Sequence, residues 1–241
     1  MPMPGTPVAR RALLLAAGAV LLASRAMAQA APRSRIGIIG SGRLGGTVGT
    51  LWAKAGHPVL FSSRNPERLK DLVDAAGPNA RAGTPAEAAA FGDAVLIAVP
   101  YGALQGVGQD LGPALAGKVV LDACNAVATR DGAVAQLAME RGIGVTSASF
   151  LPGARLVRAF NTLGSRILAD QAHRSGEPVA IPIAGDDAGA LEAAAALVRD
   201  AGFDPVVVGP LTRAADFAMG APGYGKVVPA AELRRILGLP G

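Results

Sequence analysis

The clearest chemical signal in the sequence is a glycine-spaced run, Gly40-Ser41-Gly42-Arg43-Leu44-Gly45. It matches the pattern G-x-G-x-x-G, in which each glycine has its own task. Gly40 permits a tight turn out of a strand, Gly42 lets the backbone approach a pyrophosphate, and Gly45 lets a helix pack closely on that strand. The first turn of such a helix offers unpaired N–H groups to an anion. The run therefore predicts a dinucleotide site, with a ligand-free glycine turn as the alternative.

A second group follows about 20 residues later, where a carboxylate would ordinarily bind the ribose 2′-hydroxyl of NAD. The chain has Ser62, Ser63 and Arg64 instead, and its next acid is Glu67. Hydroxyls and a guanidinium suit a 2′-phosphate, which a carboxylate would repel. Arg68 lies one helical turn beyond Arg64. The group predicts NADP(H) rather than NAD(H), against the alternative of a solvated helix start.

The flanking elements are those that such a site requires. Strands are expected over 35–40, 58–63, 94–99, 118–122, 156–160, 179–184 and 205–208. Helices are expected over 44–55, 66–76, 85–91, 104–111, 113–115, 133–141, 188–201 and 232–237. This alternation predicts an α/β fold of the Rossmann type, a doubly wound and mostly parallel sheet with a short C-terminal α/β extension. We expect one continuous domain over residues 34–241.

The first 28 residues read as a signal peptide rather than as part of the fold. Arg10-Arg11 precedes an apolar run over residues 12–23, and Ala26-Met27-Ala28 is a small-x-small cleavage pattern. The arginine pair resembles a twin-arginine export signal, with ordinary Sec export as the alternative. The apolar run is too short for a permanent membrane span. The leader predicts a periplasmic or secreted protein, or a cytoplasmic one if the leader is an annotation error.

Composition excludes several classes of function. Without residues 1–28 the chain keeps 20 basic and 18 acidic residues, too even a balance to indicate nucleic-acid binding. One cysteine, Cys124, and two histidines, His57 and His173, are too few for an ordinary zinc site. We therefore expect no metal. His57 reads as structural, His173 as solvated and Cys124 as a small packed residue.

The run 36–45, followed by Ser63-Arg64, resembles the NADPH-dependent reductases of the deazaflavin coenzyme F-420. The resemblance extends to the segments Ala98-Val99-Pro100, Asp122-Ala123-Cys124-Asn125, Ala159-Phe160-Asn161-Thr162, Ile183-Ala184-Gly185-Asp186-Asp187, 201–205 and 209–211. It covers residues 35–211. The same domain type resembles the cytoplasmic NADPH-binding part of membrane ferric reductases.

The resemblance implies an NADP(H)-dependent oxidoreductase that transfers hydride to coenzyme F-420 or a flavin-like small-molecule acceptor, and a homodimer. It places Ser41, Arg43 and Leu44 at the pyrophosphate. Val99 and Pro100 would lie on the adenosine or ribose side, and Ala159 and Asn161 near the nicotinamide. No catalytic side chain is implied, because the cofactor supplies the chemistry.

The tail, residues 219–241, is shorter than the family pattern, which argues against deazaflavin as the acceptor. An NADP(H)-binding redox sensor or partner subunit without turnover is the alternative from another class. A ferric reductase, or a hydroxyacid or imine reductase, ranks lower. The last two use a long helical domain, often with a catalytic lysine, whereas here the only lysine after Lys118 is Lys226.

Overall fold

Eight short strands, most of them fully buried, form a single sheet in the order β3-β2-β1-β4-β5-β6-β7-β8. The computed structural model describes Met1 and residues 33–240. The strands are β1 (Ile36–Ile39), β2 (Val59–Ser62), β3 (Ala80–Gly83), β4 (Ala94–Ile97), β5 (Val119–Asp122), β6 (Arg155–Arg158), β7 (Ala180–Gly185) and β8 (Asp204–Gly209). Strands β1 to β6 pair in parallel, and β7 meets β6 antiparallel before pairing in parallel with β8. This is the predicted doubly wound sheet with its C-terminal extension.

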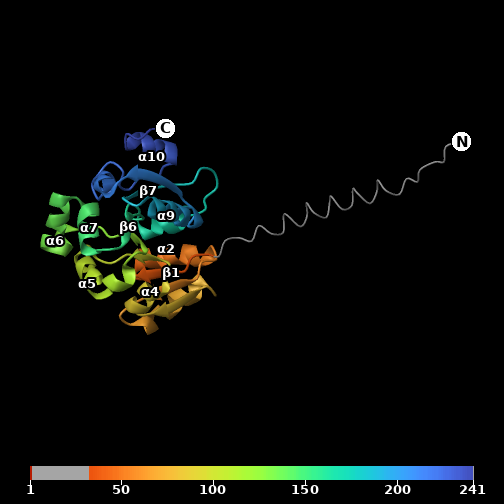
Figure 1. Cartoon of the computed structure of the whole chain (residues 1–241). Helices are drawn as coiled ribbons and strands as arrows, with labels where there is room; N and C mark the ends of the chain where they lie inside the picture. Colours follow the sequence, from red (N-terminus) through yellow and green to blue (C-terminus); the bar gives the residue numbers. More distant parts are fainter. Residues whose placement is uncertain (2–32, 241) are drawn as a thin grey trace. The chain divides into compact units, whose positions relative to one another are not determined.

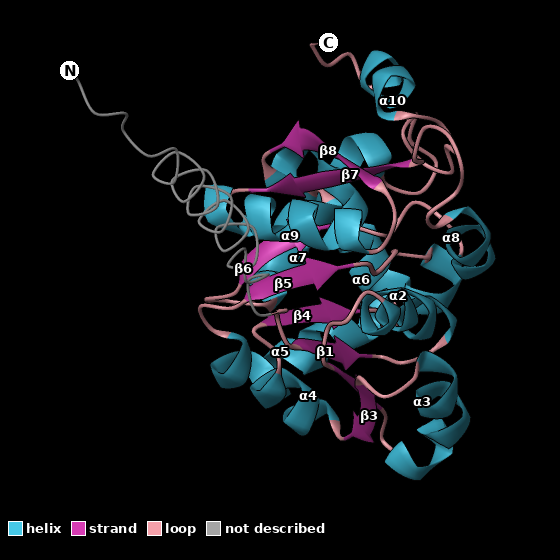
Figure 2. Ribbon diagram, turned by 90° about the vertical axis from the view of Figure 1, so that its right-hand side faces the viewer, coloured by secondary structure: helices cyan, strands magenta, loops and turns pink. Residues whose placement is uncertain are grey.

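Helices cover both faces of the sheet (Figure 1, Figure 2). The α-helices are α2 (Arg43–Lys54), α3 (Lys70–Ala76), α4 (Pro85–Phe91), α5 (Leu104–Leu115), α6 (Ala128–Arg141), α7 (Ile143–Phe150), α8 (Ser165–Gln171), α9 (Ala188–Asp200) and α10 (Ala230–Ile236). Three short 3₁₀ helices are η1 (Pro66–Leu69), η2 (Tyr101–Ala103) and η3 (Leu211–Phe217). Helices α2, α3, α8 and α9 lie on one face, and α4, α5, α6, α7, η3 and α10 on the other.

The two faces hold separate apolar cores because successive side chains of a strand point to opposite sides of the sheet. On the α2 side, Trp52 packs edge-on against Phe160, with ring centroids 5.6 Å apart, and donates its indole N–H to the Leu197 carbonyl. On the other side, Tyr101 is buried and its hydroxyl lies 3.2 Å from that of Ser147. The cores fix the sheet between two rigid layers.

Loops at the carboxyl ends of the parallel strands continue the pairing of the sheet. Ala98 N–H donates to the Ile39 carbonyl, and Ala123 N–H donates to the Ile97 carbonyl. In the same way Ala159 N–H donates to the carbonyl of Asp122. The chain segments that leave β1, β4, β5 and β6 therefore lie side by side along one edge, which is where ligands bind in open α/β sheets.

Several predicted elements need correction. Strand β3 and helix α7 were not predicted, and the two short helices predicted over 104–115 are one helix, α5, with Pro113 inside it. The strand predicted over 156–160 ends at Arg158, and helix α6 begins five residues before the predicted start at Ala133. Asn65 precedes the first residue of η1, and its side chain makes no capping hydrogen bond.

Side chains cap the first turns of two other helices, α4 and α9. Thr84 and Glu87 form a complete capping box at the start of α4. Asp187 caps α9 by accepting from Ala190 N–H, whereas Asp186 accepts from Leu211 N–H and so ties β7 to η3. Of the two aspartates, Asp187 alone therefore caps α9.

The predicted signal peptide, apart from Met1, lies outside the described residues. Residues Ser34–Gly241 form a compact unit, and all that follows concerns that unit. Within the described part of the chain, no helix combines the length and apolar character needed to cross a membrane.

Candidate functional site

The glycine run forms the turn between β1 and α2, as predicted. Gly40 has φ +94°, and a Cβ there would lie 2.5 Å from the Ala98 carbonyl oxygen. A Cβ at Gly45 would lie 2.2 Å from the Gly40 carbonyl oxygen, so the helix can approach the strand only without a side chain. No atom lies within 4 Å of the Cβ position at Gly42. Gly40 and Gly45 thus serve packing, and Gly42 leaves open space.

The N-terminus of α2 is prepared for an acceptor of hydrogen bonds. Gly42 occupies the N-cap position and supplies no side-chain cap, so the first N–H groups, those of Arg43 and Leu44 among them, have no partner from this residue. The hydroxyl oxygen of Ser41 is buried and has no hydrogen-bond partner. Because an unpartnered buried hydroxyl is costly, this turn fits a bound anion such as a pyrophosphate.

At the end of β2, the two serines differ in role. Ser62 is buried in the sheet and donates its hydroxyl to the Ile38 carbonyl at 2.7 Å, so this side chain joins β2 to β1 and is not presented to a ligand. Ser63 is half-buried, and its oxygen accepts from Asn65 N–H at 3.1 Å, which leaves the hydroxyl proton free to donate. Of the two predicted serines, Ser63 alone therefore keeps a hydroxyl that is available to a ligand.

Three arginines beside this turn, Arg43, Arg64 and Arg68, are exposed, and their side chains make no hydrogen bond or ion pair among the described residues. Seven other arginines pair with a carboxylate: Arg35, Arg130, Arg155, Arg158, Arg166, Arg213 and Arg235. The carboxyl ends of β1 and β2 thus carry three arginine side chains that no carboxylate of the described residues neutralises.

A groove of about 550 Å³ adjoins the same turn on the α2 face. Its walls come from the β1–α2 turn, α2, η1, α3 and α8, and they include Ser41, Gly42, Arg43, Arg68 and Lys54. One acidic side chain, Asp71, lies among these basic groups. The groove is therefore electropositive, which favours a phosphorylated ligand.

The ends of β4 and β1 meet directly. Besides the Ala98 carbonyl, a Cβ at Gly40 would encounter Val99 Cγ1 at 2.8 Å, so Val99 lies against the glycine turn. Val99 is half-buried and Pro100 exposed. Because the strand order reverses between β1 and β4, these residues flank the crevice in which nucleotides bind to such sheets.

At the end of β6 the chain turns through a strained residue. Phe160 has φ +60°, one of two non-glycine residues with a positive φ in the described chain. Ala159 is buried in the core, so only its backbone can serve a ligand. Asn161 is 2% exposed and donates its Nδ2 to the Phe217 carbonyl at 3.1 Å, while its Oδ1 has no partner. A buried, unpartnered carboxamide oxygen is suited to accept from an amide such as that of nicotinamide.

Sequence reasoning left Asn125 out of the site. Its Nδ2 donates to the Asn161 carbonyl at 2.7 Å, which joins the loops after β5 and β6. Arg130 donates to the Asn125 carbonyl, and the adjacent Asp131 accepts from the N–H groups of Gly102 and Val127. The hydrogen bond from Arg130, with those from the backbone, lowers the pKa of Asp131 to about 2. The available signal was a polar residue three positions after a buried strand.

Other candidate groups take no part in this edge. Burial raises the pKa of the Cys124 thiol well above its usual value, so the residue is a packed side chain and not a nucleophile. His57 is buried between the Ser34 carbonyl and Asp200, and His173 is exposed. No cluster of three or more metal-ligating side chains occurs among residues 33–240.

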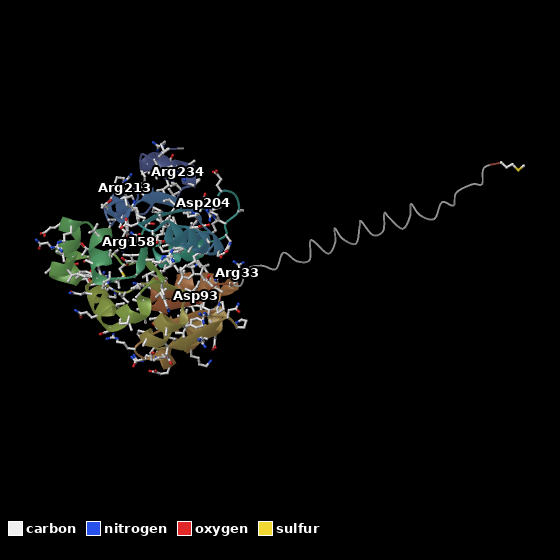
Figure 3. The ribbon with its side chains drawn as sticks, in the orientation of Figure 1. Arg33, Asp93, Arg158, Asp204, Arg213 and Arg234 are labelled. Carbon is white, nitrogen blue, oxygen red and sulfur yellow. The ribbon has the colours of Figure 1, made fainter. Side chains whose placement is uncertain are left out.

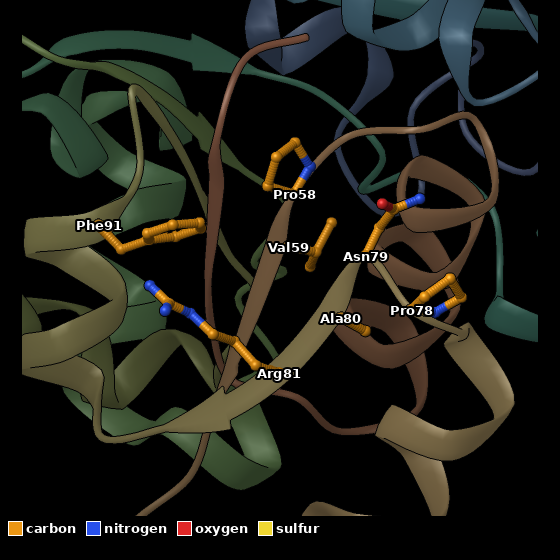
Figure 4. A pocket seen from close by; sticks show the side chains of 7 residues that line it. All are labelled: Pro58, Val59, Pro78, Asn79, Ala80, Arg81 and Phe91. Atoms are coloured by element: carbon orange, nitrogen blue, oxygen red, sulfur yellow. The ribbon is translucent and has the colours of Figure 1, made fainter.

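A separate pocket of about 290 Å³ lies at the opposite end of β2 and β3 (Figure 4). Arg81 stacks over Phe91 there, 4.3 Å from the ring centroid. This pocket contains none of the predicted site residues and lies at the amino ends of the strands. It has no part in the site described above.

Comparison with known proteins finds a family match over the part of the chain that carries most of the candidate site. Residues 35–126 match the family model described as NADP oxidoreductase, coenzyme F420-dependent. The predicted family resemblance is confirmed over this segment, from β1 to β5. The matched segment runs from β1 through β5 and contains the glycine turn, Ser63, Arg64, Arg68 and Val99. The match supports an NAD(P)-dependent oxidoreductase.

Individual relatives agree at the level of the fold. A hypothetical protein of Sinorhizobium meliloti is 25% identical, with a TM-score of 0.70 over 81% of this chain and 95% of that one. A candidate F420-dependent NADP reductase of Arthrobacter is 22% identical, with a TM-score of 0.60 over 76% and 87%. A glycerol-3-phosphate dehydrogenase [NAD(P)+] of Azorhizobium caulinodans is 29% identical over 70% of this chain. The chain spans about half the length of that last relative.

Proposed function

We propose that this protein is an NADPH-dependent oxidoreductase that passes a hydride to a deazaflavin or flavin-like acceptor. The observation that carries the proposal is the unpaired positive charge after β2. Arg64 stands where an NAD enzyme would place a carboxylate, and Arg68 follows four residues later. Neither side chain has a counter-ion among the described residues. A 2′-phosphate would supply that missing charge with charge-assisted hydrogen bonds.

The remaining residues divide the work of holding the cofactor. The Gly42 turn, Ser41 and the first N–H groups of α2 would hold the pyrophosphate. Val99 and Pro100 would flank the ribose, and Asn161 Oδ1 would accept from the carboxamide. When bound, NADPH supplies a hydride with its two electrons, and the acceptor takes up that hydride together with a proton from solvent.

This chemistry explains why the edge lacks an acid–base pair. Asn125 and Asn161 cross-link the loops after β5 and β6 through the Asn125 Nδ2 bond to the Asn161 carbonyl. The protein's contribution is to hold two rings in line and to keep water out. No described residue has to gain or lose a proton for the hydride to move.

The proposal is tested by stopped-flow oxidation of NADPH by leaderless protein, with riboflavin, a deazaflavin and a ferric chelate as alternative acceptors. Rapid oxidation with one of these and slower oxidation of NADH is the expected result. Tight NADPH binding without oxidation by any acceptor would contradict an enzymatic role and favour a redox sensor or partner subunit. Oxidation by the ferric chelate alone would contradict the flavin-like acceptor.

We also propose that residues 1–28 direct export by the twin-arginine route. The support is the sequence pattern of Arg10-Arg11, an apolar run and a cleavage motif. Replacing both arginines by lysine should block that route and leave cleaved protein absent from the periplasm. Undiminished export of the lysine variant would indicate the Sec route, and an uncleaved wild-type chain in the cytoplasm would contradict export altogether.

A further inference from the structure

A second cavity, of about 320 Å³, opens between the α6–α7 corner and the end of η3. It is lined by Ala126, Ala138, Met139, Gly142, Ile143, Ala215, Ala218 and Met219. None of these side chains carries a charge or a hydrogen-bonding group. Glu140 and Arg141 lie between lining residues in the chain, yet neither lines the cavity. The side chains of its wall are therefore apolar, and its polar surface is backbone.

The cavity adjoins the nicotinamide end of the candidate site. Ala126 directly follows Asn125, whose Nδ2 donates to the Asn161 carbonyl. Ala218 directly follows Phe217, whose carbonyl accepts from Asn161 Nδ2. Two wall residues are thus next in the chain to groups that hold Asn161, and Asn161 itself has a buried, unpartnered Oδ1.

The walls are held in place by close packing. A Cβ at Gly144 would lie 2.2 Å from the Leu211 carbonyl oxygen, so α7 and η3 touch backbone to backbone below the cavity. Gly142, at the corner between α6 and α7, has φ +88°, which a glycine adopts without strain. The backbone of the corner that carries the cavity is consequently fixed by direct contact with η3.

We propose that this cavity binds the ring of the electron acceptor, and that it selects a small, flat, uncharged ring system over an anionic one. The inference rests on the proposed function and specifies its second substrate. The volume lies at the lower end of the roughly 300–1,000 Å³ of ligand sites, enough for a single ring system. No side chain of the wall offers a charge to a phosphate or carboxylate, so an anion would lose hydration there without a counter-ion.

Met139 and Met219, at 77% and 48% exposure, form the outer lip of the cavity. A methionine side chain is flexible and its sulfur makes favourable contacts with aromatic rings, so both residues are suited to contact a flat ring at the cavity mouth. The alternative occupant of such an exposed apolar lip is a second copy of the chain. The test below separates the two.

Riboflavin and FMN share one ring and differ by a terminal phosphate, so they form a matched pair of probes. Binding is measured by flavin fluorescence anisotropy on leaderless protein, with and without NADP⁺. We expect the Kd of riboflavin to be roughly tenfold lower than that of FMN, the result of about 1.4 kcal/mol of discrimination. Equal affinity, a preference for FMN, or no binding of either probe would overturn the proposal.

The substitution Met139→Lys sharpens the test because its aliphatic stem keeps the lip covered while its ammonium group adds a cation. It should lower the Kd of FMN by about fivefold and leave that of riboflavin nearly unchanged. The control Val207→Lys changes another exposed apolar residue, on β8 and outside the cavity, and should alter neither Kd.

Light scattering tests the other occupant. A dimer that Met139→Lys converts to a monomer would show that a second copy covers the cavity, and would overturn the proposal. Calorimetry with NADPH keeps this inference distinct from the proposed function. NADPH binding without a preference for riboflavin contradicts the cavity assignment alone, whereas absence of NADPH binding contradicts the proposed function itself.

Discussion

The two ends of the carboxyl edge use their charged residues in opposite ways. Beside β1 and β2, Arg43, Arg64 and Arg68 have no partner among the described residues. Beside β5 and β6, Arg158 pairs with Asp122 at 2.6 Å and Arg130 with Asp131 at 2.8 Å. Charge left unmatched by the fold prepares a surface for an anion, whereas charge matched within the fold fixes the backbone around a neutral ligand. Sequence alone cannot distinguish these uses, because both consist of arginines near strand ends.

The largest effect is expected from the ion pair between Asp122 and Arg158, at the ends of β5 and β6. Arg158 is labelled in Figure 3. Both side chains are fully buried, and Asp122 Oδ1 also accepts from Cys124 N–H. Arg158→Met should lower the free energy of unfolding by about 3–5 kcal/mol, because it leaves a buried carboxylate without its partner. The measurement is urea denaturation. Adding Asp122→Leu should recover most of the loss, and a single variant as stable as wild type would refute the structural role.

A smaller effect is expected from the glycine turn, where two glycines should respond differently. Gly45→Ala forces a Cβ to within 2.2 Å of the Gly40 carbonyl and should cost about 1–3 kcal/mol of stability. Gly42→Ala places its Cβ in open space and should leave stability unchanged while weakening NADPH binding. Thermal unfolding and calorimetry are run on both. If Gly42→Ala keeps full NADPH affinity, no ligand approaches at that position.

Asp131, which pairs with Arg130 beside β5, should make the stability of the protein depend on pH. Its pKa is lowered to about 2 by Arg130 and backbone N–H groups, so its stabilising contribution is present above the usual carboxyl pKa near 4. That contribution is lost as pH falls through the folded-state value. Asp131→Asn should therefore cost about 2 kcal/mol at neutral pH and progressively less in acid. Urea titrations at neutral pH and near pH 3 make the comparison; a loss independent of pH would contradict the titration of Asp131 as its cause.

The sequence predicted the first half of the fold closely because each of its signals is local. Strands β1 and β4 are unbroken apolar runs, and β2 is one up to Ser62. Thr84 and Glu87 form a cap from residues three apart in the chain. Strand β3 was missed because its exposed Arg81 and small alanines lack the β-branched pattern, and pairing with β2 creates it. Helix α7 was missed because Gly142 and Gly144 interrupt the pattern, although close packing on η3 requires Gly144.

The candidate site also contains residues that local sequence predicts and residues whose roles depend on distant contacts. The glycine turn follows from spacing, and the structure leaves Arg64 and Arg68 unpaired as a phosphate site requires. The burial of Ser62 was not predictable, since the direction of its hydroxyl depends on pairing with β1. Asn125 was missed because its role depends on contact with the Asn161 carbonyl, 36 residues away in the chain.

Calorimetry with NADPH and NADH on wild type and Arg64→Ala tests the central claim most directly. Wild type should bind NADPH roughly ten- to a hundredfold more tightly, since a hydrogen bond to a charged group contributes about 1.5–3 kcal/mol. Arg64→Ala should remove most of that preference by weakening NADPH alone, and the control Arg235→Ala, in α10, should change neither affinity. A wild-type preference for NADH, or an equal loss of both nucleotides in Arg64→Ala, would contradict the account.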